Sequence, residues 1–299
     1  MKTEKWLELN TASLAGKTVV ITGSTGGIGT KLCEILASLG ASLVLADRNA
    51  EKSEENGKRL QSRFPSLSVS YVQCDLEDIP SVKRAAKELC AMPVDVLIHN
   101  AGAYSIPRHK CATGLDNVFQ INFASPYYLT KMLLPVLRER GGRVVAVGSI
   151  AHNYSETDPA DVDFSSRTRA SRVYGNAKRY LMFSLYGLFE NESNVSLAVC
   201  HPGITFTNIT AHYPKAVFAI IKNPMKVIFM KPERACLSIV RGVFEDCKSC
   251  EWIGPRFFDV WGLPAKRTLD TCPPEERARI FGTAEQIYAD MENCKIPTA

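Results

Sequence analysis

Short apolar runs alternate with longer segments of helical periodicity through the first two thirds of the chain. Six runs are rich in Val, Ile and Leu: Thr18–Ile21, Ser42–Ala46, Val69–Gln73, Val94–Ile98, Arg143–Val147 and Val195–Cys200. Continuous runs of this kind are typical of parallel strands that are covered on both faces. The segments between them are long enough to hold crossover helices. The pattern therefore predicts a doubly wound α/β fold with helices on both faces of one sheet.

The helical pattern is clearest where apolar residues recur at spacings of three and four. Leu32, Ile35, Leu36 and Leu39 form one such stripe, which Gly40 closes. Beyond Cys200 the alternation stops, and an irregular, apolar-rich segment extends to Met230. A helix from Pro232 to Phe244, a last strand at Glu251-Trp-Ile and a helical tail from Pro274 to Met291 are predicted after it.

Composition excludes several classes of protein. The 299 residues are 45% hydrophobic and 22% charged, which excludes a disordered chain. The net charge of +5 comes from dispersed basic residues, so we expect no nucleic-acid partner. The first residues mix both charge signs, no apolar run reaches the length of a membrane span, and a cytoplasmic location is expected.

Cysteine usage indicates reduced thiols. Most of the ten cysteines lie inside apolar segments, as Cys33, Cys90 and Cys200 do. Cys247 and Cys250 have CxxC spacing, but no second Cys/His pair stands at zinc-finger distance. We therefore expect no metal site.

A glycine-rich loop follows the first predicted strand, with the sequence Thr22-Gly23-Ser24-Thr25-Gly26-Gly27-Ile28-Gly29. It leads into a helix expected near Thr30, whose N-terminal N–H groups can bind a phosphate. Gly23 allows a tight turn, Gly27 allows backbone to approach a pyrophosphate, and Gly29 allows helix and strand to pack closely. Asp47 ends the second strand about 20 residues later, where an acid can accept hydrogen bonds from ribose hydroxyls. The alternative is a glycine-rich turn without a ligand.

The glycine spacing G-x-x-x-G-x-G resembles that of the short-chain dehydrogenase/reductase superfamily, and further matches follow in order. They are Asp75-Leu76, His99-Asn100-Ala101-Gly102, Asn122, Ser149, Tyr174-Gly-Asn-Ala-Lys178, and His201-Pro202-Gly203 with Thr207. The resemblance implies a parallel seven-stranded sheet of order 3-2-1-4-5-6-7. It also implies NAD(P)-dependent interconversion of an alcohol and its carbonyl compound. His99 replaces the first Asn of the family's NNAG motif, and we expect His99 and His201 to be structural.

The resemblance assigns the catalytic roles to Asn122, Ser149, Tyr174 and Lys178. The last two are four residues apart, so a helix places both on one face, and an ammonium beside a phenol is expected to lower the phenol pKa. Ser149 can donate to the same substrate oxygen as Tyr174. Asn122 in the family bends its helix and supports a proton relay. The alternatives are a half-buried Tyr, a surface Lys and a locally bonded Asn.

The cofactor site implied by the family extends over most strand ends. Asp47 repels a 2′-phosphate and favours NAD, whereas Arg48 could pair with that phosphate, so NAD is expected and NADP stays possible. Gly26 occupies a position at which relatives that prefer NADP often carry a basic residue. The expected contacts are Gly23, Ser24, Thr25, Gly27, Ile28, Gly29, Asp47, Arg48, Asp75, Leu76, Asn100, Ala101, Gly102, Tyr174, Lys178, Pro202, Gly203, Thr205 and Thr207.

The carboxyl third resembles the branch of retinol dehydrogenases and WW-domain oxidoreductase-like proteins, which implies a lipophilic alcohol or ketone of steroid or retinoid type. Residues 1–14 are interpreted as an extension and 15–299 as one domain, within which 204–231 would form an apolar substrate lid. Family habit suggests a homodimer or homotetramer. Two other functions stay open: a non-catalytic dinucleotide-binding scaffold or sensor, and a reductase for small polar carbonyl compounds.

Overall fold

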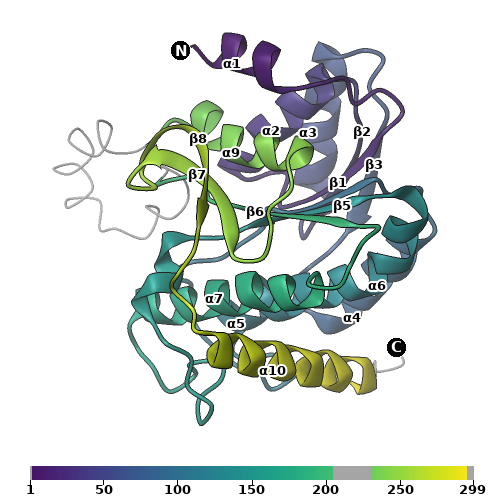
Figure 1. The fold of residues 1–299 in the computed structure, drawn as a ribbon. Helices are drawn as coiled ribbons and strands as arrows, with labels where there is room; N and C mark the ends of the chain where they lie inside the picture. The colour runs from purple at the N-terminus through teal and green to yellow at the C-terminus, as the bar shows by residue number, and fades with distance from the viewer. Residues whose placement is uncertain (1, 205–229, 295–299) are drawn as a thin grey trace, which may run out of the picture.

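A computed structural model describes residues 2–204 and 230–294, and within them a single sheet of eight strands has the order β3-β2-β1-β4-β5-β6-β7-β8 (Figure 1). The predicted order is confirmed for the first seven strands, which are parallel. The strands are β1 (Thr18–Thr22), β2 (Ser42–Asp47), β3 (Val69–Gln73), β4 (Val96–His99), β5 (Arg143–Val147), β6 (Ser196–Cys200), β7 (Glu251–Phe257) and β8 (Trp261–Thr268).

The eighth strand corrects the prediction of seven. Strand β8 pairs antiparallel with β7 and forms the edge of the sheet. Its residues are partly exposed along most of their length, so neither a continuous apolar run nor a clean alternation marks it. It also contains Gly262 and Pro264, which are depleted in strands, and Pro is tolerated at an edge because its missing N–H costs no ladder bond there.

Two apolar cores lie on the two faces of the sheet. Side chains alternate along β1, so that Val20 enters one core while Val19 and Ile21 enter the other. One face is covered by α1 (Thr3–Asn10), α2 (Gly27–Ser38), α3 (Ala50–Arg63) and α9 (Pro232–Phe244). The other is covered by α4 (Ile79–Cys90), α6 (Ser125–Arg140), α7 (Ala170–Leu188) and α10 (Pro274–Asn293), which lie together on the lower side in Figure 1. Shorter elements are α5 (Asn117–Phe119), η1 (Gln120–Ala124) and η2 (Ile150–Tyr154).

The amino-terminal extension is attached to the first of these cores. Helix α1 packs against α9, and its Trp6 is 3% exposed. Since the strands share one sheet, we propose that residues 15–299 form a single domain with residues 1–14 packed onto it. The lid predicted over 204–231 falls almost wholly outside the described residues.

Candidate active site

The glycine loop has the geometry of a close helix–strand turn. Gly23 has a φ of +69°, which other residues adopt only with strain. A Cβ at Gly29 would lie 2.1 Å from the carbonyl oxygen of Gly23, so a larger residue cannot be placed there without displacing backbone. Asn100 fixes the loop by donating to the carbonyl oxygens of Thr22 and Gly23 at 3.0 and 2.9 Å.

Helix α2 begins at Gly27, three residues before the predicted start near Thr30. Its N-cap is Gly26, and no side chain caps the terminus or places a carboxylate in the first turn. The N–H groups of a first helical turn have no partner within the helix, and the dipole makes that end positive. The arrangement can therefore bind an anion beside the glycine loop.

Asp47 ends β2 beside this loop and is 3% exposed. Its carboxylate accepts hydrogen bonds from the hydroxyls of Ser24 and Ser53, the latter at 2.8 Å, and from the backbone N–H of Thr25 at 3.4 Å. The carboxylate thus holds the second strand to the glycine loop. Arg48, the next residue, is exposed.

The other predicted nucleotide contacts follow the strand ends. Leu76 is buried, and its carbonyl oxygen accepts from Ser125 at 2.6 Å, while Asp75 caps the following turn by accepting from Glu77 N–H. Pro202 and Gly203 follow β6, and Gly203 has a φ of +79°. Thr205 and Thr207 lie outside the described residues.

Tyr174 and Lys178 lie one turn apart on α7, beside the end of β5. The Lys178 ammonium is buried, donates to the Val147 carbonyl oxygen at 2.9 Å and lies 5.7 Å from the centroid of the Tyr174 ring. Ser149 follows β5 and is hydrogen-bonded to Tyr174. The structure therefore brings three of the four predicted catalytic side chains together.

The electrostatics of this group differ from the expectation that Lys178 lowers the phenol pKa. Burial raises the pKa of Tyr174 to about 12, while the hydrogen bond with Ser149 opposes the rise. Burial also lowers the pKa of Lys178 to about 8. Desolvation disfavours the charged form of both groups, and the hydrogen bond that the ammonium donates goes to the Val147 carbonyl oxygen. Tyr174 therefore keeps its proton at neutral pH.

Asn122 is fully buried in η1, a π-helical segment between α5 and α6. Its side chain donates to the carbonyl oxygens of Ala103 and Val118, both at 2.8 Å, and accepts from Ala103 N–H at 3.2 Å. The irregular helix agrees with the bend that the family resemblance implies. A Cβ at Gly102 would lie 2.8 Å from the Asn122 side-chain oxygen and 3.6 Å from the Lys178 nitrogen, which places Gly102 beside both.

His99 and His201 are both buried, as expected of structural residues. His99 bonds Thr130 at 2.8 Å through Nε2, and burial lowers its pKa to about 3. His201 stacks on Trp252 with ring centroids 5.2 Å apart, and burial lowers its pKa to about 4. Both are therefore neutral at pH 7.

A buried network that no sequence pattern indicated holds the Ser149 turn. His152 is fully buried, and its ring nitrogens bond the Ser149 carbonyl oxygen at 2.6 Å and the Thr271 hydroxyl at 2.9 Å. Arg179, next to Lys178, donates to the His152 carbonyl oxygen at 3.3 Å and pairs with Glu276 of α10. No local signal marks this set, because its members come from three separate segments.

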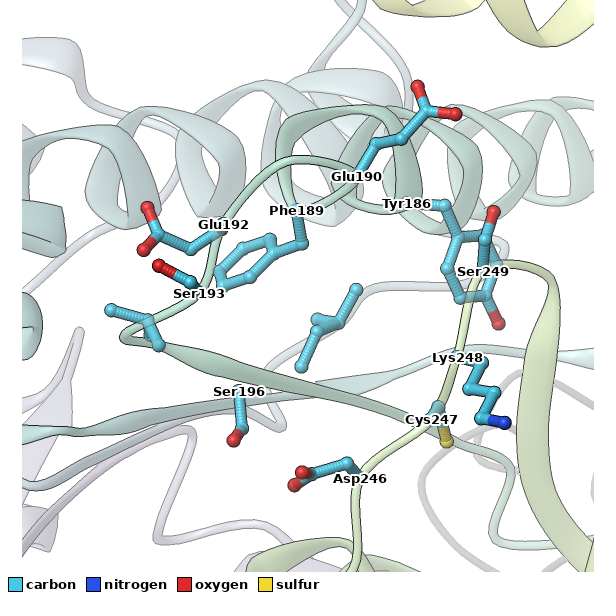
Figure 2. A pocket seen from close by; sticks show the side chains of 12 residues that line it. Tyr186, Phe189, Glu190, Glu192, Ser193, Ser196, Asp246, Cys247, Lys248 and Ser249 are labelled. Atoms are coloured by element: carbon cyan, nitrogen blue, oxygen red, sulfur yellow. The ribbon is translucent and has the colours of Figure 1, made fainter.

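Two cavities occur away from these residues. One of about 360 Å³ lies below the end of α7, where Figure 2 shows Tyr186 and Phe189 above Ser196 and Asp246. Ser196 begins β6, so this cavity lies at the amino edge of the sheet, opposite the candidate site. Another of about 400 Å³ is lined by residues 108–110, 116 and 165–168. Neither is lined by a residue predicted to be catalytic or to bind the cofactor.

Three further observations concern residues 2–204 and 230–294. No cluster of three or more His, Cys, Asp or Glu side chains there could hold a metal ion. The cysteines, Cys247 and Cys250 among them, are free thiols. None of the helices in these residues is both long enough and apolar enough to cross a bilayer.

The sequence is similar to those of known dehydrogenases. The family model of short chain dehydrogenases matches residues 17–159. Dehydrogenase/reductase SDR family member FEY from Arabidopsis thaliana is 30% identical over 296 residues, which cover 91% of this chain and 76% of that protein. Human polyprenol dehydrogenase is 28% identical over 207 residues, or 66% of this chain and 63% of that protein. The chain spans just under two thirds of the length of several such relatives.

The fold also matches solved structures. An uncharacterised protein from Mycobacterium Paratuberculosis superposes with a TM-score of 0.70 at 25% identity, and the match covers 96% of both chains. The similarity therefore includes the carboxyl third, in which the sequence pattern was least regular.

Proposed function

Because the chain belongs to the short-chain dehydrogenase/reductase family, we propose that it interconverts a lipophilic alcohol and its carbonyl compound with a nicotinamide cofactor. One observation carries the proposal: Ser149, Tyr174 and Lys178 meet at the carboxyl edge of the sheet, beside the glycine loop and the uncapped start of α2. Ligands of open α/β sheets bind at this edge.

The residues present fit a dinucleotide. The loop needs glycine at Gly23 and Gly29, the α2 terminus offers N–H groups to a pyrophosphate, and Gly102 leaves space beside Asn122 and Lys178. When bound, the cofactor supplies or accepts the hydride. We propose NAD as the preferred cofactor because the Asp47 charge beside the loop disfavours a 2′-phosphate, with NADP as the alternative if Arg48 outweighs it.

The proposed roles follow from the protonation states. Tyr174 keeps its proton at neutral pH, so it can donate that proton to a carbonyl oxygen that becomes negative, and it must lose the proton when an alcohol is oxidised. Ser149 stabilises the same oxygen by a hydrogen bond. Lys178, with a pKa of about 8, can supply a proton near neutral pH. Asn122 holds the backbone at Ala103 and supports the relay.

The lipophilic substrate class is supported by the surroundings of Tyr174. Its ring meets Tyr104 edge to face, with centroids 5.3 Å apart. Tyr174 also packs against a small buried apolar cluster of Val118, Phe164 and Val173, which Ile106 contacts too. The name of the human relative, polyprenol dehydrogenase, refers to a lipid alcohol. A reductase of small polar carbonyl compounds and a non-catalytic scaffold or sensor are the rival functions. The homo-oligomer and the cytoplasmic location stay predictions.

The decisive experiment follows the absorbance of the reduced cofactor with a panel of alcohols at fixed NAD. Retinoid- or steroid-sized alcohols should give a higher kcat/KM than short polyols. Better turnover of polyols would favour the polar-substrate alternative. Cofactor binding without any turnover, across alcohols and the matching ketones, would favour the scaffold.

A further inference from the structure

The turn that joins β7 to β8 carries a concentration of exposed aromatic side chains. Phe257 is 57% exposed, Phe258 83% and Trp261 43%. Among the described residues six large hydrophobic side chains are exposed, and three of them fall on these five consecutive positions. Scattered exposed hydrophobic residues are ordinary, but a cluster on one turn marks an interaction site.

The backbone of this turn is unfavourable for the residues that occupy it. Phe258 and Asp259 have φ values of 54° and 56°, and the N–H of Val260 donates to the Phe257 carbonyl oxygen at 3.0 Å. This is the geometry of a type I′ turn, which favours Asn-Gly because both central residues have positive φ. A bulky Phe at the first of these positions is strained, and its exposed ring adds nothing to the core. Neither the backbone conformation nor the exposed ring of Phe258, at the tip of the turn, therefore stabilises the isolated protein.

The exposed charge at the tip of the turn is positive. Arg256 is exposed beside Phe257, and among the described residues no acidic side chain pairs with it. Asp259 is partly buried and is paired with Arg267 at 3.3 Å. The exposed charge next to the aromatic side chains is thus a guanidinium, which binds phosphate groups well.

The size of the cluster decides between a protein partner and a lipid surface. The exposed parts of the three aromatic side chains amount to an area on the order of 350 Å². A stable contact with a second copy buries about 800 Å² on each partner, usually over a flatter surface. A fluid bilayer accepts a narrow protrusion, with Trp at the headgroup level, Phe among the acyl chains and Arg at the phosphates.

We propose that the β7–β8 turn docks the protein onto the surface of a bilayer that contains anionic phospholipids. The hairpin lies against the turn after β6, where a Cβ at Gly203 would be 3.0 Å from the Pro255 side chain of β7 and from the carbonyl oxygen of Val260 in the β7–β8 turn. Docking would hold the candidate site close to the membrane, in which lipophilic alcohols dissolve. The docking itself does not depend on the proposed dehydrogenase activity.

The test is co-sedimentation of the full chain with vesicles of phosphatidylcholine, with and without phosphatidylserine. The key variant is Phe258→Asn, because Asn suits a type I′ turn. It should keep or raise the melting temperature while reducing binding to phosphatidylserine vesicles about tenfold or more. Leu9→Asn removes a side chain that is 65% exposed on α1 and should leave binding unchanged. Arg256→Gln should weaken the binding and reduce its dependence on salt.

Three results would overturn the proposal. The first is a wild-type chain that binds neither vesicle, and the second is unchanged binding by Phe258→Asn. The third is a loss of self-association in Phe258→Asn without any effect of lipid, which would identify the turn as a contact between copies. Oxidation of a water-soluble alcohol should be the same in wild type and Phe258→Asn. Failure of the docking and failure of the dehydrogenase function are thus separate outcomes.

Discussion

Breaking the buried pair between Arg179 and Glu276 should destabilise the protein strongly. The two side chains are 3% and 7% exposed, and Glu276 also accepts from the backbone N–H and the hydroxyl of Thr157 at 3.1 and 2.9 Å. In Glu276→Met, Arg179 would be left charged and buried without its carboxylate partner, which should lower the free energy of unfolding by about 4 kcal/mol. Burial alone would raise the pKa of Glu276, but the hydrogen bonds and charge of Arg179 and the contacts with Thr157 lower it to about 2, so the carboxylate is charged in the folded protein.

The assay is urea unfolding of Glu276→Met, Arg179→Met and the double variant. The double variant should lose less stability than the sum of the single losses, because two apolar side chains can replace a buried pair at little cost. Lys58→Met is the control, since the Lys58–Glu54 pair is 74% and 54% exposed and such pairs contribute about 0.5 kcal/mol or less. A loss below about 1 kcal/mol in Glu276→Met, or additive single losses, would refute the reasoning.

Three further outcomes are expected. Gly29→Ala should abolish cofactor binding or folding. Gly26→Ala should fold and bind NAD, because its Cβ would lie 3.5 Å from the Gly23 carbonyl oxygen, and a thermal-shift titration with NAD distinguishes the two variants. In the unfolded chain His99 takes up a proton below about pH 6.5, whereas the buried His99 does so only near pH 3, so the free energy of unfolding decreases as the pH falls from about 6.5 to about 3. In urea melts at several pH values, His99→Asn should reduce this pH dependence by up to about 1.4 kcal/mol per pH unit. Asp47 should give NAD an advantage of about one or two decades in kcat/KM over NADP, and a clear preference for NADP would mean that Arg48 outweighs Asp47.

Local sequence patterns were sufficient to predict most of the fold. The apolar runs that gave β1, β2, β4, β5 and β6 are buried along almost their whole length, so sequence pattern and burial agree there. Strand β3 lies at the other edge of the sheet, and only its Val72 is buried. The edge strand β8 was missed because an edge strand that is partly exposed needs no continuous apolar run, and its Gly and Pro are signals of a turn. The start of α2 was placed three residues late because glycine is an unusual residue inside a first helical turn.

The site was only partly accessible to sequence reasoning. Spacing placed Tyr174 and Lys178 on one helical face, but the phenol pKa is raised above all by burial, which depends on segments distant in the chain. The contact of His152 with Thr271 joins the segment after β5 to the residues just before α10, and the contact of Arg179 with Glu276 joins α7 to α10. Such long-range hydrogen bonds leave no periodicity or spacing in a single sequence.

The central proposal is that Tyr174 exchanges the proton that accompanies hydride transfer. The most direct test is to compare wild type with Tyr174→Phe, measuring NAD binding by titration and turnover of a retinoid or steroid alcohol by the absorbance of reduced cofactor. The proposal predicts nearly unchanged binding and a loss of about two or more decades in rate, because only the proton-exchanging hydroxyl is removed. Near-normal turnover by Tyr174→Phe would contradict the proposed role.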